Sequence, residues 1–234
     1  MRRSVPGEDP LYWVGSSKRD RLAFPEAVQD LIGAALSVAQ FGGKHPDAKS
    51  WKGEGPGVLE VVERHDGNAY RAVYVVRFAG AVYVLHCFQR SRREGFKRQE
   101  RTSNSSRSGS GWLANIMRID MVRPRAESGS RIVRSSGNVF SDLGFRDADE
   151  RQMKVRLTVA INEILRRRHL SQGQAAQRLG INQPKVSALS KYKLEGFSVE
   201  RLMRFLTSLD QDVEIIIRNK PRGRRAARVS VRAA

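Results

Sequence analysis

The sequence predicts an α+β fold in which a small helix-plus-antiparallel-sheet domain precedes an all-α domain with a terminal strand. Three observations support this. β-rich runs separated by turn residues lie between residues 58 and 89, a basic Ser/Gly-rich stretch follows, and apolar residues then recur at helical spacing up to residue 209. We therefore expect four segments, at residues 1–89, 90–137, 138–220 and 221–234.

The first segment contains one helix and several short strands. Residues 11–17 are expected to open it as a strand, and Pro25 marks the start of a helix because its ring suits the first helical turn. After a polar loop, three β-rich runs predict an antiparallel meander with a hairpin turn at Asp66-Gly67. The apolar stripe of the helix consists of Val28, Leu31, Ile32, Ala35, Leu36 and Ala39.

The stretch 90–137 differs in composition from both of its neighbours. Residues 90–134 contain 12 basic and 4 acidic residues among many serines and glycines, without helical or strand periodicity. Such a composition is typical of a flexible basic linker. The tail 221–234 is also basic, and we expect it to be disordered.

Residues 170–196 are the most informative segment, because they predict a helix-turn-helix. Ser171 and Gln174 have the spacing of a capping box, and Gly180 suits a left-handed turn. Asn182 is expected to cap the second helix, whose first turn tolerates Pro184. The core-facing residues of that helix are Val186 and Leu189, and the outward-facing ones are Gln183, Lys185 and Ser187.

Two further helices frame this motif. One is expected over residues 151–168, after a short docking segment at 138–145, and the other follows Ser198 as its N-cap. Residues 213–219 are β-rich and predict a strand that Pro221 ends. The expected buried residues are Met153, Leu157, Ala160, Ile161, Ile164 and Leu165 in the first helix and Val199, Leu202, Met203, Leu206 and Leu209 in the second.

The charge and the cysteine count narrow the function classes. A formal net charge of +19 attracts polyanions, of which nucleic acid is the commonest soluble one. We find no apolar run of the roughly 18 residues that a membrane span needs, and no signal peptide at the start. Cys87 is the single cysteine, and the four histidines are scattered. We therefore expect a cytoplasmic protein with no cofactor and no metal site.

The helix-turn-helix residues, from Ser171-Gln172 to Val186-Ser187, resemble the Cro/repressor-type (XRE) DNA-binding family. The resemblance implies a homodimer that reads a palindromic operator in double-stranded DNA, with two recognition helices about 34 Å apart. Gly173 and residues 190–193 depart from the family pattern. The expected DNA contacts are Ser171, Gln172, Asn182, Gln183, Lys185 and Ser187, with Gln172 toward phosphate and Gln183 toward a base edge.

The run from Gly57 to Gln89 resembles the RelE/HigB-like toxins, in particular their phage-derived Gp49-like branch. Such toxins are small ribonucleases that cut mRNA on the ribosome. Arg71 matches the strand arginine of that family and is the candidate catalytic residue, with Lys52 and Arg77 as nearby cations. The family continues with a Thr-Pro and a C-terminal amphipathic helix, which residues 90–116 do not match.

We attribute this departure to a shift of reading frame. Read one base earlier, the codons of residues 94–118 are compatible with a peptide that restores the Thr-Pro and an amphipathic helix. The shift would fuse a toxin frame to a downstream antitoxin frame that begins near Met117 or Met121. Sequencing the gene tests this hypothesis.

Residues 138–220 resemble the HigA-like antitoxins, which bind their toxin and repress their own operon. We therefore expect a DNA-binding transcriptional regulator of antitoxin type, with a cognate RelE/HigB-like toxin as a second partner. One alternative is an active ribosome-dependent mRNA endoribonuclease, which would need the missing helix to cover the sheet and complete its site. Another is a nonspecific polyanion binder, which would not distinguish operator from scrambled DNA.

Overall fold

The structure is a computed structural model that describes residues 8–51, 57–78, 80–90 and 132–220, with Gly223, Ala227, Val229 and Val231 beyond them. Lys52, the proposed frame-shifted residues 94–118, and most of the expected linker and tail lie outside this described part. The chain divides into two compact units. The sheet unit comprises Asp9–Ile32 and Asp47–Ser135, and the helical unit comprises Met1–Glu8, Gly33–Pro46 and Ser136–Ala234.

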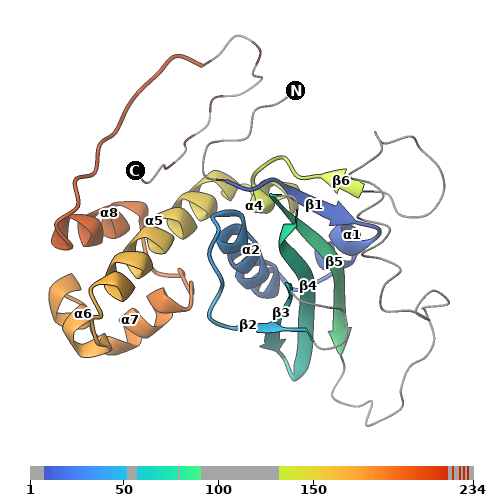
Figure 1. The fold of residues 1–234 in the computed structure, drawn as a ribbon, viewed down its shortest axis with the longest axis horizontal. Coiled ribbons are helices and arrows are strands. Elements are labelled where there is room, and N and C mark those ends of the chain that lie inside the picture. Colours follow the sequence, from blue (N-terminus) through green and yellow to red (C-terminus); the bar gives the residue numbers. More distant parts are fainter. Residues whose placement is uncertain are drawn as a thin grey trace. The chain divides into compact units, whose positions relative to one another are not determined.

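The sheet unit is built on one mixed six-stranded sheet with the strand order β2-β3-β4-β5-β1-β6 (Figure 1). β1 (Leu11–Val14) pairs parallel to β5, and the other neighbours pair antiparallel. The helices are α1 (Ser17–Leu22) and the first part of α2 (Glu26–Gln40). The remaining strands are β2 (Ala48–Ser50), β3 (Val58–His65), β4 (Asn68–Phe78), β5 (Ala81–Arg90) and β6 (Ile132–Arg134). The α+β class and the predicted meander β3-β4-β5 are confirmed.

The predicted hairpin is present at the expected turn. His65 of β3 pairs with Asn68 of β4, so Asp66 and Gly67 alone connect the strands. Both have positive φ, 47° and 75°, which is the conformation of a type I′ turn. The Asp-Gly pair was therefore a reliable sequence signal.

Three short elements were not predicted. The polar sequences of α1 and β2 lack apolar periodicity, and β2 and β6 have three residues each. β6 lies within the stretch that we expected to be a linker, where it pairs with β1 through Trp13 and Val133. Such strands are set by a partner far away in sequence, so a local pattern does not reveal them.

Apolar side chains of β3, β4 and β5 form a buried cluster in the sheet unit. Val58, Val73, Val75, Ala81, Tyr83 and Leu85 are all buried and form one cluster. Aromatic side chains pack against this cluster. Tyr12 on β1 stacks on Tyr83 with ring centroids 5.2 Å apart, and Trp51 meets Phe88 edge-on with centroids 6.3 Å apart. Tyr12, Trp51 and Phe88 are partly buried and extend this apolar cluster.

The helical unit contains α4 (Val139–Asp142), α5 (Ala148–Arg167), α6 (Gln172–Leu179), α7 (Gln183–Ser190) and α8 (Val199–Ser208). Aliphatic and aromatic side chains form its core, and their burial from water stabilises the unit. Of the residues predicted to be buried in α5 and α8, Met153, Ala160, Ile164, Val199 and Met203 are only partly buried, and Phe205 is an additional core residue. The largest fully buried side chains in this part of the unit include Phe140, Ile161, Leu189, Leu202 and Leu209.

The terminal strand predicted at residues 213–219 is absent from the single chain. These residues have no regular secondary structure, and Ile215, Ile216 and Ile217 are exposed. A strand needs a neighbour for its backbone N–H and C=O groups, and no other described strand pairs with this segment. β-propensity alone therefore overstated what one chain can form.

Candidate nucleic-acid interface

The first helix of the motif begins with the predicted capping box. The backbone N–H of Gln174 donates to Ser171 Oγ over 3.3 Å, and the N–H of Ser171 donates to Gln174 Oε1 over 2.8 Å. These two bonds satisfy amides that have no partner within the helix. α6 then ends at Gly180, which has the left-handed φ of 64° that the short turn requires.

The second helix of the motif is fixed by Asn182. Its Oδ1 accepts from the backbone N–H of Lys185 over 3.0 Å, as expected of an N-cap, and Pro184 stands in the first turn. Val186 and Leu189 are buried in the core of the helical unit. Because these two residues fix the rotation of α7, its opposite face points to solvent.

The structure places every predicted DNA contact at the surface of α6 or α7. Gln183 and Lys185 are exposed on the first turn of α7, whereas Ser187 is half-buried. A Cβ added to Gly173 would come within 3.4 Å of Gln183 Nε2, so the beginnings of the two helices lie close together. The predicted contacts that are fully exposed are Ser171, Gln172, Asn182, Gln183 and Lys185.

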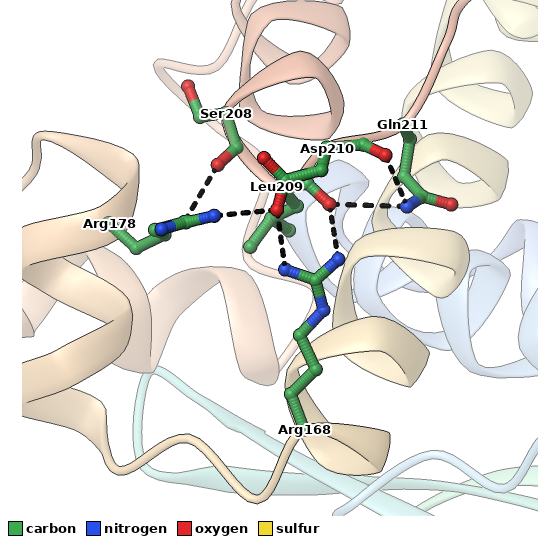
Figure 2. A network of polar contacts seen from close by, with 6 residues as sticks. All are labelled: Arg168, Arg178, Ser208, Leu209, Asp210 and Gln211. Carbon is green, nitrogen blue, oxygen red and sulfur yellow. Dashed lines mark hydrogen bonds and ion pairs between the residues drawn. The ribbon is translucent and has the colours of Figure 1, made fainter.

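A network of polar contacts, shown in Figure 2, ties the end of α8 to α5 and α6. Arg178 of α6 donates to Asp210 Oδ2 over 2.6 Å and to the Ser208 carbonyl over 3.0 Å. Arg168, at the end of α5, donates to the same carboxylate oxygen over 3.0 Å and to the Leu209 carbonyl over 2.7 Å. Hydrogen bonds from these two guanidinium groups lower the pKa of Asp210. The network thus satisfies carbonyls at the end of a helix and holds three helices together.

Sequence reasoning missed this network. Arginines at helix ends are a weak signal, because most basic residues there are simply solvated. Asp210 also has a positive φ of 58°, which an aspartate tolerates better than most residues. Only the folded arrangement brings Arg168 and Arg178 to one carboxylate.

The atypical stretch after α7 has a structural role. Tyr192 is buried, and its ring lies 5.3 Å from that of His45, a residue of the same unit. His45 Nε2 lies 3.2 Å from the Lys191 carbonyl. Burial raises the pKa of the Tyr192 hydroxyl. Lys191 and Lys193 remain exposed beside α7, so this departure from the family pattern adds cations next to the motif.

In the sheet unit, the candidate catalytic residue Arg71 is engaged by a carboxylate. Arg71 Nη1 donates to Glu60 Oε2 over 2.5 Å, and the side chains are 22% and 16% exposed. The side chain of the second cation, Arg77, lies outside the described part, as does Lys52. Burial raises the pKa of the Cys87 thiol to about 12, so this cysteine stays protonated and unreactive at neutral pH.

These features define a class of protein: a helix-turn-helix domain that follows a mixed-sheet domain. The family model for a helix-turn-helix domain matches residues 139–218, and the model for the phage-derived protein Gp49-like family matches residues 20–104. The second match continues beyond residue 89, where we expected the toxin-like segment to end.

A solved structure described as an XRE family transcriptional regulator is 69% identical to this chain, with a TM-score of 0.37. The alignment covers 38% of this chain and 99% of that one. The chain therefore belongs to the XRE family through its helix-turn-helix region, and it carries a Gp49-like domain of the RelE/HigB toxin type before it. A comparison with curated proteins gives no match. Within the described residues, no helix has the length and apolar character needed to cross a membrane.

Proposed function

We propose that this chain is a sequence-specific DNA-binding regulator of antitoxin type that represses its own operon. One observation carries the proposal: Gln183 and Lys185 stand exposed on the first turn of α7, while Val186 and Leu189 anchor the same helix in the core. A rigid helix with polar residues at its N-terminal end is the element that enters the DNA major groove in helix-turn-helix proteins.

Each exposed residue has a chemical role in this proposal. The amide of Gln183 offers a donor and an acceptor, which suit the N6 and N7 positions of adenine. Lys185 carries a flexible charge suited to a phosphate or to guanine. At the beginning of α6, Ser171 and Gln172 lie where partial positive charge at a helix N-terminus favours a DNA phosphate.

The rest of the helical unit keeps these groups in position. The capping box and the Gly180 turn fix the ends of α6, and the Asp210 network holds α6 against α5 and α8. Preorganised contacts lose less entropy on binding, so they contribute more to affinity and to specificity. The high net charge adds a salt-dependent attraction to any DNA.

The test compares the full chain on two duplexes of equal length at fixed salt. One duplex carries the DNA upstream of its own gene, and the other carries the same bases in scrambled order. We expect the upstream duplex to bind about 10³-fold more tightly or better, the usual margin of specific over nonspecific binding. Equal affinity for the two duplexes would refute a sequence-specific regulator and favour a polyanion binder.

For the Gp49-like domain we propose a role as a remnant or a regulatory appendage rather than as a working ribonuclease. The ribonuclease alternative has one observation in its favour, the family match over residues 20–104. Against it, Arg71 already has a carboxylate partner at 2.5 Å, and a phosphate would have to displace Glu60. Glu60 would also repel the charge that develops on a phosphate during cleavage.

A cognate RelE/HigB-like toxin and a second copy of this chain are the protein partners that follow from the antitoxin proposal. A palindromic operator presents two equivalent half-sites about one DNA turn apart. Two-fold symmetry in the protein matches this arrangement, so that each copy reads one half-site.

A further inference from the structure

We infer that residues Asp212–Lys220 form the dimerisation element, as a two-stranded antiparallel ribbon made by two copies of the chain. This inference deepens the proposed function, which calls for a two-fold protein. It begins from the exposure of three consecutive isoleucines, Ile215, Ile216 and Ile217, at 74%, 59% and 94%. Contiguous exposed apolar side chains on a monomer mark an interaction site.

The sequence of the segment is complementary to itself. In an antiparallel pair centred on Ile216, Glu214 stands directly opposite Arg218 of the second copy, and Arg218 opposite its Glu214. One step further out, Asp212 stands opposite Lys220 of the second copy. Opposite charges on facing residues stabilise a ribbon, and like charges destabilise it.

The same register sorts the side chains by face. Residues at even positions carry the charges, with Ile216 meeting its own copy at the two-fold axis. On the other face, Ile215 stands opposite Ile217 of the second copy, and Val213 lies next to them. Val213 already packs against the core of the helical unit, so the apolar face of the ribbon would be continuous with that core.

Other registers lose part of this agreement. If the two strands were shifted by one residue relative to each other, a charged residue of one copy would stand opposite an isoleucine of the other. A shift by two would keep the faces but leave only one charge pair within the segment, Asp212 with Arg218 or Glu214 with Lys220. It would also place Ile216 opposite a charged residue. The register centred on Ile216 therefore fits best, and it satisfies the backbone groups that the single chain leaves without a strand partner.

A charge swap in the full chain tests the register. The variants Glu214→Arg and Arg218→Glu each place like charges opposite one another, twice per dimer. We expect each to weaken self-association by about tenfold or more. The double variant E214R/R218E should dimerise like the wild type, and so should an equimolar mixture of the two single variants. Sedimentation velocity across a concentration series, without DNA, measures the association.

Three results would overturn the inference: a wild type that stays monomeric throughout the series, single variants that dimerise as the wild type does, or a mixture and double variant that do not recover. The substituted side chains are exposed, and circular dichroism verifies that the helices remain. Association is measured without DNA. A failure to dimerise can therefore be distinguished from a failure to prefer the upstream duplex over the scrambled one. Each single variant should keep wild-type affinity for a duplex that holds one half-site, and a loss there counts against a purely dimerising role.

Discussion

Gln183 lies beside Gly173, at the point where the beginnings of α6 and α7 approach each other. The residue is exposed, its backbone is fixed by the Asn182 cap, and its amide has no bulky neighbour on the α6 side. At the scale of single residues, this is the position from which we expect the chain to read a base.

We predict that Gln183→Ala and Lys185→Ala each weaken binding to the preferred duplex by about 1–3 kcal/mol, because each removes a direct contact to DNA. Gln183→Ala should also reduce the preference for one base within the half-site. Competition binding at constant salt measures both effects. Gln177→Ala and Lys49→Ala are matched controls, since both residues are exposed and neither belongs to α7. Unchanged binding by the two test variants would mean that α7 is not the reading element.

Gly173 offers a prediction about stability. It lies in α6 with helical geometry, and a Cβ there would make an ordinary contact with the Gln183 amide. Gly173→Ala should therefore stabilise the helical unit by up to about 1 kcal/mol, the difference in helix propensity. Urea unfolding followed by circular dichroism measures this. A loss of stability would show that the position cannot hold a side chain.

Residue-level features were predictable where they depend on neighbours in sequence. The Ser171–Gln174 box, the Asn182 cap and the Asp66-Gly67 turn each involve residues no more than three positions apart. Arg71 and Glu60 lie on different strands, and only the register of β3 and β4 brings them together. No local pattern shows that partnership.

At the scale of elements, the arrangement of α6 and α7 is supported by the other two long helices of the unit. α7 packs against α5, and α6 packs against α8. The Asp210 carboxylate is the junction, with guanidinium groups from two elements on one oxygen. Its pKa lies below the ordinary value of 3.8. A depressed folded-state pKa means that the ionised group favours the folded state above the unfolded pKa, and that this contribution is lost as the pH falls.

We predict that Asp210→Asn lowers the thermal midpoint at pH 7, because the two arginines lose their anionic partner. Asparagine accepts the positive φ, so the backbone itself stays unstrained. The difference between variant and wild type should shrink as the pH falls below about 4 and disappear once the wild-type carboxyl is protonated. Melting curves across this pH range measure it. A difference that persists unchanged at low pH would assign the effect to something other than the charge.

Elements with strong periodicity were predicted well, and those defined by a partner were not. α2, α5 and α8 each carry an apolar stripe at helical spacing. β6 and β2 are short strands fixed by β1 and β3. Residues 213–219 are the opposite case, a β-rich sequence without a partner strand in its own chain.

At the scale of the whole molecule, two family domains stand in one chain. The Gp49-like match and the helix-turn-helix match lie at residues 20–104 and 139–218. The sequence predicted this order, since each half carries its own motif.

We predict that the full chain does not cleave mRNA. Catalysis by the family depends on cations free to hold a phosphate, and Arg71 is held by Glu60. Incubation with ribosomes and a defined mRNA, followed by primer extension, should give no new ends. Cleavage that disappears in Arg71→Ala and increases in Glu60→Gln would contradict this and restore the ribonuclease function.

The measurement that bears most directly on a sequence-specific regulator is binding-site selection from random duplex DNA with the full chain. We predict enrichment of an inverted repeat whose half-sites lie about 10 base pairs apart, centre to centre. The Gln183→Ala chain should enrich a repeat with one position relaxed in each half. A pool that shows no common sequence after repeated selection, or the same sequence for both chains, would contradict the assignment of α7 as the helix that reads DNA.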